Sequence, residues 1–242
     1  MPPLLYAHRG ASGHYPENTM EAFRGALRQR ADGIELDVQL SLDEEVMVIH
    51  DHRLERTTDG QGLVQSRTRD ELLQLRAGIY ADPRYRDARI PTLEKVLQTF
   101  APTSLRFNIE LKNFLIPQPG LEEQVVALIR KYRLVRRTVI SSFNFDSLLR
   151  VKELNPRQPT GLLYVGPLRR PCEVAAQYEA DQLHVPNEEL TPALVKQAKR
   201  NGFSILVWTV DAPQRIRACS RMGVDGIITN YPLRARKALL RQ

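Results

Sequence analysis

Residues 182–229 read QLHVPNEELTPALVKQAKRNGFSILVWTVDAPQRIRACSRMGVDGIIT and contain three short apolar runs separated by two longer amphipathic stretches. The apolar runs predict strands at Gln182–Val185, Ser204–Val210 and Gly226–Thr229. The stretches between them predict helices at Thr191–Asn201 and Ala212–Met222. Strands that alternate with helices in this way are typical of a parallel sheet, in which each helix connects two neighbouring strands.

The same alternation runs through the rest of the chain. Further strands are predicted at Leu4–Ala7, Gly33–Leu40, Leu105–Leu111, Thr138–Ser142 and Gly161–Val165. Further helices are predicted at Thr19–Arg30, Thr92–Phe100, Leu121–Tyr132, Phe145–Leu154, Cys172–Ala180 and Leu233–Leu240. Eight strands alternating with eight helices predict an α/β fold, a (β/α)8 TIM barrel. The alternative is an open doubly wound sheet, which usually needs fewer repeats and a glycine-rich first turn; the sequence contains no G-x-G-x-x-G motif.

Two segments interrupt this alternation after the second predicted strand. Residues Glu45–His50 alternate in hydrophobicity and predict a short strand that folds back on the strand before it. Residues 51–90 are then too many for an ordinary loop, and Thr68-x-x-Glu71 before Leu72 predicts a helix within them. We expect one domain covering residues 1–242, with residues 51–90 as a small insertion packed over the mouth of the barrel.

The composition is that of a globular protein, with 42% hydrophobic and 26% charged residues in a chain of 242. Its two cysteines, Cys172 and Cys219, lie far apart and predict neither a disulfide framework nor a metal site, which suits a reducing compartment. The N-terminus lacks the basic and apolar regions of a signal peptide. No apolar run approaches the length of about 18 residues that suggests a membrane span. We therefore expect a cytoplasmic protein with no membrane span.

The net charge of +7 comes mainly from arginines spread over many segments. Basic residues cluster at two places, Lys131, Arg133, Arg136 and Arg137 in one and Arg234, Arg236, Lys237 and Arg241 in the other. Such clusters are typical of solvated helix faces; the alternative is that they attract anionic substrates or a membrane surface. No nucleic-acid partner is expected, because basic and aromatic residues are not interleaved. A homo-oligomer is compatible with the sequence.

Reactive side chains gather at the predicted carboxyl ends of the strands, where the active sites of such barrels lie. On the second and third strands they share one face, because side chains along a strand alternate with period two. The set comprises His8 and Arg9 at the end of the first strand, Glu35 and Asp37 on the second, His50 at the end of the fold-back strand, Glu110 and Lys112 on the third, Trp208 near the end of the seventh and Asn230 after the eighth.

Three carboxylates on one barrel rim would repel each other and lose hydration, and a divalent cation removes this penalty. Oxygen ligands select a hard ion, Mg²⁺ or Ca²⁺, over zinc. Such an ion would bind a phosphate oxygen and offset the charge that builds on phosphorus. Arg9 and Lys112 can bind the remaining oxygens, and His8 and His50 can divide general acid and general base catalysis. The set therefore predicts the metal-dependent cleavage of a phosphate ester.

Each of these residues taken alone has a plainer explanation. A Glu-x-Asp pair on a strand is often two ordinary polar positions, or it pairs with a nearby arginine. His50-Asp51 fits a capped loop, and Trp208 fits the core. His184, near another predicted strand end, is a weaker candidate for contacting substrate. The prediction depends on the combination, which places these residues at matching ends of successive strands.

Eight stretches of the chain form a recognisable series. They are HRGASGHYPENTMEAF, GIELDVQLSLDEEVMVIHD, DHRLERTTDGQG, IPTLEKVL, NIELK, SSFN, VWTVD and DGIITNYP. In these stretches, which occur in the family's order and cover nearly the whole chain, the sequence resembles the glycerophosphodiester phosphodiesterases, a family of metal-dependent (β/α)8 hydrolases.

This resemblance implies a role for each candidate residue. The metal ligands would be Glu35, Asp37 and Glu110, holding one divalent cation, Mg²⁺ or Ca²⁺. The paired catalysts would be His8 and His50. Arg9 and Lys112 would bind the phosphate, and Trp208 would form part of an apolar wall around the glycerol or its substituent. The implied insertion after the second strand matches residues 51–90.

The implied reaction is hydrolysis of a small-molecule glycerophosphodiester, such as glycerophosphocholine or glycerophosphoethanolamine, to sn-glycerol 3-phosphate and an alcohol. The attacking group is water, or the glycerol hydroxyl attacks first to give a cyclic phosphate that water then opens. One alternative is a lysophospholipase D-like enzyme, which needs an apolar channel or a membrane-docking surface; no exposed hydrophobic stretch is evident in the sequence. A more remote alternative is a non-catalytic phosphate-binding barrel, which would lack a ligand or a histidine.

Overall fold

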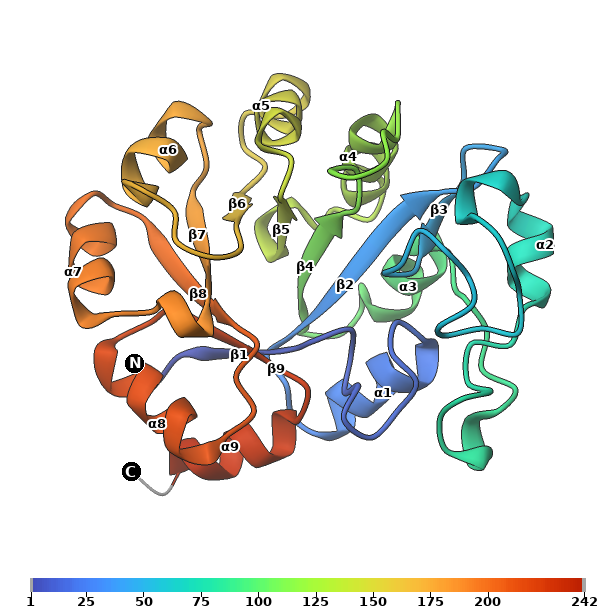
Figure 1. The fold of residues 1–242 in the computed structure, drawn as a ribbon, viewed down its shortest axis with the longest axis horizontal. Coiled ribbons are helices and arrows are strands. Elements are labelled where there is room, and N and C mark those ends of the chain that lie inside the picture. The colour runs from blue at the N-terminus through green and yellow to red at the C-terminus, as the bar shows by residue number, and fades with distance from the viewer. Residues whose placement is uncertain (1, 241–242) are drawn as a thin grey trace.

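The computed structural model describes residues 2–240 and shows a closed barrel of parallel strands with helices around it (Figure 1). The strands are β1 (Leu4–Ala7), β2 (Gly33–Leu40), β4 (Arg106–Leu111), β5 (Thr138–Ser142), β6 (Thr160–Leu163), β7 (Gln182–Pro186), β8 (Ser204–Trp208) and β9 (Gly226–Thr229). They pair in this order, and β1 pairs with both β2 and β9, which closes the barrel. The predicted (β/α)8 TIM barrel is confirmed, and the open sheet is wrong.

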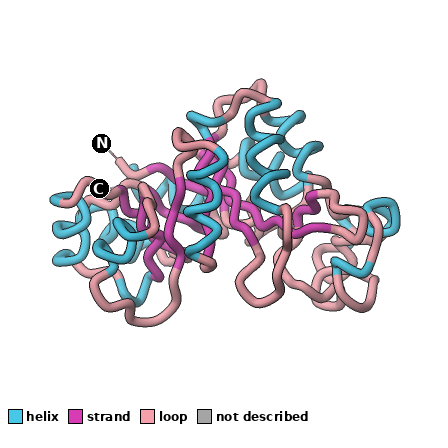
Figure 2. Tube along the Cα trace, turned by 90° about the horizontal axis from the view of Figure 1, so that it is seen from above, coloured by secondary structure: helices cyan, strands magenta, loops and turns pink. Residues whose placement is uncertain are grey.

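Helices connect the strands and lie outside them, as the cyan and magenta segments of Figure 2 show. They are α1 (Met20–Arg28), α3 (Leu93–Phe100), α4 (Leu121–Lys131), α5 (Phe145–Leu154), α6 (Pro171–Gln177), α7 (Pro192–Arg200), α8 (Pro213–Met222) and α9 (Pro232–Leu240). Three of them begin after a threonine whose hydroxyl accepts a hydrogen bond from a backbone N–H of the first turn, which fixes the helix start: Thr19, Thr92 and Thr191.

Several element ends differ from the predicted ones by one to three residues, and two of these differences have identifiable reasons. Helix α6 ends at Gln177, before the predicted Ala180, and Glu179 has a left-handed backbone conformation (φ 50°) that a helix cannot contain. Strand β8 ends at Trp208 rather than Val210, because its partner β7 ends at Pro186, which lies opposite Trp208. The end of a strand thus depends on where the neighbouring strand ends, and this cannot be predicted from the local sequence.

The predicted fold-back strand is β3 (Val46–Val48), which runs antiparallel to β2 with Val38 opposite Val48. Within residues 51–90 the predicted helix is α2 (Arg69–Gln74), and Thr68 and Glu71 form the capping box at its start. In Figure 1 α2 lies apart from the other helices, beyond β3. An apolar cluster packs this segment against β3; it is formed by Leu54, Val64, Leu72 and Ile90 together with Met47 and Ile49. Its predicted position over the barrel mouth stays a prediction.

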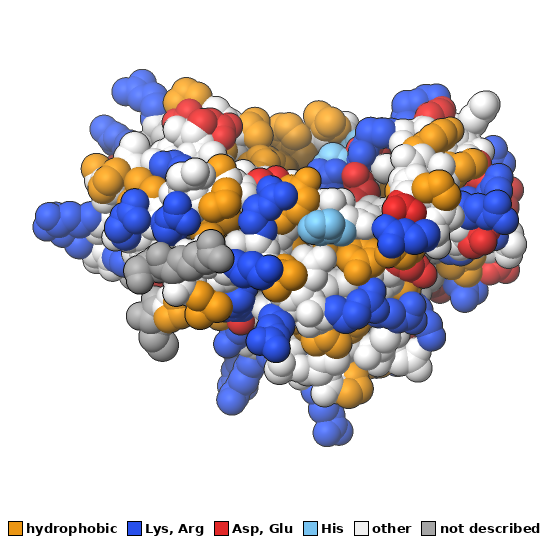
Figure 3. Space-filling view, turned by 90° about the horizontal axis from the view of Figure 1, so that it is seen from below, with side chains coloured by type: hydrophobic (Ala, Val, Ile, Leu, Met, Phe, Trp, Pro, Cys, Tyr) orange, Lys and Arg blue, Asp and Glu red, His pale blue; other side chains and the backbone are white. Residues whose placement is uncertain are grey.

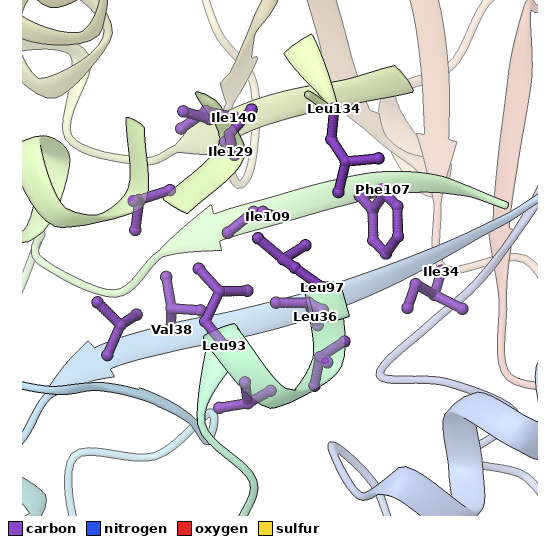
Figure 4. Close-up of a cluster of buried hydrophobic side chains, with 14 of the residues drawn as sticks. Ile34, Leu36, Val38, Leu93, Leu97, Phe107, Ile109, Ile129, Leu134 and Ile140 are labelled. Carbon is purple, nitrogen blue, oxygen red and sulfur yellow. The ribbon is translucent and has the colours of Figure 1, made fainter. Parts of the chain in front are cut away.

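The hydrophobic core between the strands and the helices determines which residues of a strand face outward to the helices and which face into the barrel. Figure 4 shows Ile34, Leu36 and Val38 of β2 beside Leu93 and Leu97 of α3, and all five are fully buried. Burying a large aliphatic side chain contributes about 1.5–3 kcal/mol to folding, so this register of β2 is strongly favoured. Because side chains alternate along a strand, the intervening acidic residues of β2 must point into the barrel.

Candidate active site

The predicted site residues meet at the carboxyl ends of the strands. His8 and Arg9 follow β1 directly, Lys112 follows β4, and His50 lies two residues after β3. A cavity of about 180 Å³ is lined by seven of the eight residues to which the resemblance assigns a role, namely His8, Arg9, Glu35, His50, Glu110, Lys112 and Trp208, together with Asn108, Phe143, Leu163 and Ile228. The eighth, Asp37, is buried and forms an ion pair with Lys112.

Three buried carboxylates form the acidic part of the site. Glu35, Asp37 and Glu110 each offer an oxygen, and these oxygens all lie within 4.8 Å of one another. The cluster follows from strand register, because Asp37 of β2 lies opposite Glu110 of β4. The backbone N–H of Arg9 donates to Glu35 Oε2 at 2.7 Å, and Asn18 Nδ2 donates to Asp37 Oδ2 at 2.8 Å.

The carboxylates ionise unequally because their neighbours differ. Burial, together with the charge of Asp37, raises the pKa of Glu35 to about 8 and that of Glu110 to about 7. Burial also tends to raise the pKa of Asp37, but Arg9 and Lys112 outweigh it and hold this pKa below its ordinary value. Three acidic groups are thus crowded against only two cationic side chains.

Lys112 and Arg9 are the cationic part of the site. Lys112 Nζ lies 2.6 Å from Glu110 Oε1 and 3.8 Å from Asp37 Oδ1. Arg9 Nε lies 3.4 Å from Asp37 Oδ2, and its Nη1 donates to Glu17 Oε1 at 2.8 Å. Among the residues that the structure describes, buried Arg9 Nε has no hydrogen-bond acceptor. A buried N–H without an acceptor suits a site that binds an anion.

His8 is oriented by a chain of hydrogen bonds from the last strand. Asn230 Nδ2 donates to Asp211 Oδ2 at 2.7 Å, which turns the amide oxygen Oδ1 toward His8. His8 Nδ1 lies 2.8 Å from this oxygen, so Nδ1 carries the proton and Nε2 is left for chemistry. Burial, followed by the charge of Arg9, lowers the pKa of His8.

His50 is held from both sides of its ring. Its Nδ1 lies 2.5 Å from Asp51 Oδ1, a carboxylate oxygen that can only accept, so Nδ1 carries a proton. Its Nε2 lies 3.2 Å from the ammonium group of Lys112, which donates to it. Burial, helped by Lys112 and Arg9 and opposed by Asp37, lowers the pKa of His50. The two histidines therefore share one arrangement, with a protonated Nδ1 bound to an oxygen and an unprotonated Nε2, which in His50 faces Lys112.

An apolar wall lies on one side of the cavity. Trp208 is fixed by a hydrogen bond from its Nε1 to the backbone oxygen of His184 at 3.0 Å, and its ring meets Phe143 edge-on with 5.9 Å between centroids. Leu163 and Ile228 complete this wall. The side chain of His184 is fully buried, contacts Gln182 and does not line the cavity, so its suggested contact with substrate is wrong.

Sequence reasoning did not assign roles to four polar residues that hold the site together. Asn18 donates to Asp37, and Glu17 accepts from Arg9. The feature of the sequence that could have indicated them is the run Pro16-Glu17-Asn18-Thr19 shortly after the first strand. Asn230 was placed at a strand end without a role. Asp211 lies in the stretch VWTVD, but its contact with Asn230, which joins the ends of β8 and β9, could not be predicted from either local sequence.

The donor set fits a divalent cation. It consists of carboxylate oxygens alone, close enough together for one ion, and hard cations such as Mg²⁺ and Ca²⁺ prefer such ligands. Burial is the main cause that raises the pKa values of Glu35 and Glu110, and the charge of Asp37 raises them further. A cation bound among the three carboxylates would favour their ionised forms.

Comparison with known proteins identifies the family. Residues 8–234 match the sequence model of the glycerophosphoryl diester phosphodiesterase family. The chain belongs to this family. The chain is 42% identical over 232 residues to a protein of Caldanaerobacter subterraneus named glycerophosphodiester phosphodiesterase, covering 96% of each chain. The prediction that the protein is an enzyme of this family is confirmed.

Solved structures of the family share the fold. A putative glycerophosphoryl diester phosphodiesterase from Silicibacter pomeroyi superposes with a TM-score of 0.90 at 27% identity and covers 99% of this chain and 94% of its own. A phosphodiesterase from Oleispira antarctica, solved with its product sn-glycerol-3-phosphate, has a TM-score of 0.88 at 29% identity and covers 98% of this chain and 97% of its own. Between residues 2 and 240, no helix combines the length and apolar character needed to span a membrane.

Proposed function

We propose that the protein hydrolyses glycerophosphodiesters, such as glycerophosphocholine and glycerophosphoethanolamine, to sn-glycerol 3-phosphate and an alcohol. The observation that carries this proposal is that a buried three-carboxylate cluster, two cations and two histidines face a single cavity. The Oleispira antarctica relative, which was solved with sn-glycerol-3-phosphate, supports the same product.

Glu35, Asp37 and Glu110 would hold one divalent cation, Mg²⁺ or Ca²⁺. When bound, this cation supplies positive charge for a phosphate oxygen and for the charge that develops on phosphorus. Lys112 and Arg9 bind the other phosphate oxygens, and among the described residues the buried Arg9 Nε, 3.4 Å from Asp37 Oδ2, still lacks a hydrogen-bond acceptor. Trp208 packs against the glycerol or its substituent.

His8 and His50 move the protons. One Nε2 takes the proton from the nucleophile, and the other, once protonated, gives a proton to the departing alcohol oxygen. Asn230 and Asp51 keep the two rings in the required tautomer. The nucleophile is water, or it is the glycerol hydroxyl of the substrate, in which case water opens a cyclic phosphate in a second step.

One observation favours a second candidate function, lysophospholipase D-like hydrolysis. Phe114 and Leu115, on the loop that begins at Lys112, are 65% and 76% exposed, so the expectation of no exposed hydrophobic stretch is wrong. Figure 3 shows hydrophobic side chains beside a hollow at the upper edge of the face, and basic side chains scattered over the rest. The cavity argues against an acyl chain, because about 180 Å³ is below the usual 300–1,000 Å³ of pockets for larger ligands.

Substrate preference separates the two functions. We expect kcat/KM for glycerophosphocholine to exceed that for lysophosphatidylcholine by at least about tenfold, because the site holds the polar part of either substrate but has little room for an acyl chain. Choline release from both compounds, measured below the micelle-forming concentration of the lipid, gives the ratio. A preference for lysophosphatidylcholine would support the second candidate, and no release from either would contradict the proposed function.

A further inference from the structure

We propose that Arg56 is a positioning residue that sets the geometry of both His50 and Arg9, and so couples residues 51–90 to the two sides of the active site. The inference rests on the proposed function, in which these two residues act on the substrate. It assigns a role to the stretch DHRLERTTDGQG, whose residues do not line the active-site cavity.

Arg56 binds two carboxylates at once. Its Nε and Nη2 donate to Asp51 Oδ2 and Oδ1 at 2.5 and 3.0 Å. Its Nη1 and Nη2 donate to Glu17 Oε2 and Oε1 at 2.9 and 2.7 Å. Both contacts are two-pronged, which the rigid planar guanidinium group allows and an ammonium group does not.

Each of these carboxylates also contacts a residue of the active site. Asp51 accepts from His50 Nδ1, and Glu17 accepts from Arg9 Nη1. Two relays therefore start at Arg56, one through Asp51 to the imidazole and one through Glu17 to the phosphate-binding guanidinium. Among the described residues, Arg56 is the one arginine or lysine that forms an ion pair with Asp51.

The backbone that presents Arg56 is firmly anchored. Leu54 is fully buried in the apolar cluster that packs residues 51–90 against β3, and its N–H donates to the backbone oxygen of Gly62 at 3.0 Å. Thr58 is also buried, and its hydroxyl donates to the backbone oxygen of Leu54 at 2.7 Å. A side chain on such a support can orient its partners, because its own position is restricted.

Stability alone gives a weak reason for this arrangement. The Arg56 side chain is 47% exposed, and ion pairs with this much solvent contact contribute little to folding. Its loss should instead change how the site is arranged. Without Arg56, Asp51 and Glu17 would repel each other and gain rotational freedom, so the imidazole of His50 and the guanidinium of Arg9 would lose their fixed orientations.

The test compares Arg56→Ala, Arg56→Lys and a matched control, Arg76→Ala, with the wild type. Arg76 lies in the same segment and forms an exposed ion pair with Asp59. We expect Arg56→Ala to lower kcat/KM for glycerophosphocholine by about 10- to 100-fold, the loss expected from a misplaced catalytic group. We expect Arg56→Lys to show nearly the same loss of kcat/KM. Added guanidinium ion should restore part of the activity of Arg56→Ala. The control Arg76→Ala should have the wild-type kcat/KM.

A second readout keeps this inference separate from the proposed reaction. The ¹⁵N spectrum of the histidine rings reports the proton on His50 Nδ1 without turnover. We expect this proton to be protected from exchange in the wild type and in Arg76→Ala but not in Arg56→Ala. The positioning role would be overturned if Arg56→Ala left the His50 signal unchanged and either kept the wild-type kcat/KM or was not rescued by guanidinium ion. A wild type with a protected His50 proton but no turnover would instead contradict the proposed function alone.

Discussion

Chelation of divalent cations is expected to abolish glycerophosphodiester hydrolysis, and added Mg²⁺ or Ca²⁺ is expected to restore it. The reason is electrostatic: Glu35, Asp37 and Glu110 are buried together, and the two nearby cations, Arg9 and Lys112, already pair with Asp37 and Glu110. A phosphate diester adds a further negative charge to the same cavity. Without the cation, no positive charge beyond the already paired Arg9 and Lys112 would offset that of the diester, and binding as well as turnover should fail.

Substitution of a ligand should act like chelation. We expect Glu110→Gln to weaken cation binding by at least about 100-fold, because loss of a residue that merely supports a ligand already costs 10- to 100-fold. Calorimetric titration with each cation measures this loss, and circular dichroism checks the fold. The matched control is Glu122→Gln, since Glu110 and Glu122 are each 9% exposed but Glu122 lies on α4, accepts a hydrogen bond from Asn113 and is not part of the carboxylate cluster. Full activity after rigorous chelation, or wild-type affinity in Glu110→Gln, would contradict the metal assignment.

Removal of either active-site histidine is the second large effect that we expect. His8→Ala and His50→Ala should each lower kcat by about 10²- to 10⁴-fold, the usual contribution of a positioned general acid or base. KM should change less, because Arg9 and Lys112, which contact the phosphate in the proposed complex, stay in place. Steady-state kinetics with saturating cation separate the two parameters.

His14→Ala is the control for both variants. His14 lies on the same loop as His8 but is exposed and does not line the active-site cavity. We expect His14→Ala to keep the wild-type kcat. Near-normal turnover in His8→Ala or in His50→Ala would remove that histidine from the mechanism. If His14→Ala lowered kcat as much as His8→Ala or His50→Ala does, the loss would reflect general destabilisation of the protein and not the removal of a catalytic group.

The sequence was sufficient to predict the barrel because its signals are local and repeated. Each strand carries an apolar run, and the register of β2 is fixed by Ile34, Leu36 and Val38 on the outer face. Once that register is known, the inward direction of Glu35 and Asp37 follows from the period of the strand. The candidate catalytic residues meet at one end of the barrel because they lie at the carboxyl ends of strands that all run parallel.

The contacts that orient the site were beyond reach because they join distant segments. His8 and Asn230 are 222 residues apart, and Arg56 and Glu17 are 39 apart. Which polar side chains meet at these distances depends on loop geometry and rotamers. The role of Arg56 could not be predicted for the same reason: Asp51 is a local partner, but Glu17 reaches Arg56 only when the first loop and the segment after β3 lie side by side.

The central claim is that this cavity cleaves the bond between phosphorus and the alcohol oxygen of a glycerophosphodiester. The most direct measurement is ³¹P NMR of glycerophosphocholine incubated with the protein and a divalent cation. We expect the diester signal to be replaced by that of sn-glycerol 3-phosphate, with free choline, in the wild type and not in Glu110→Gln. Persistence of the diester in the wild type, or its conversion to phosphocholine and glycerol, would contradict the account.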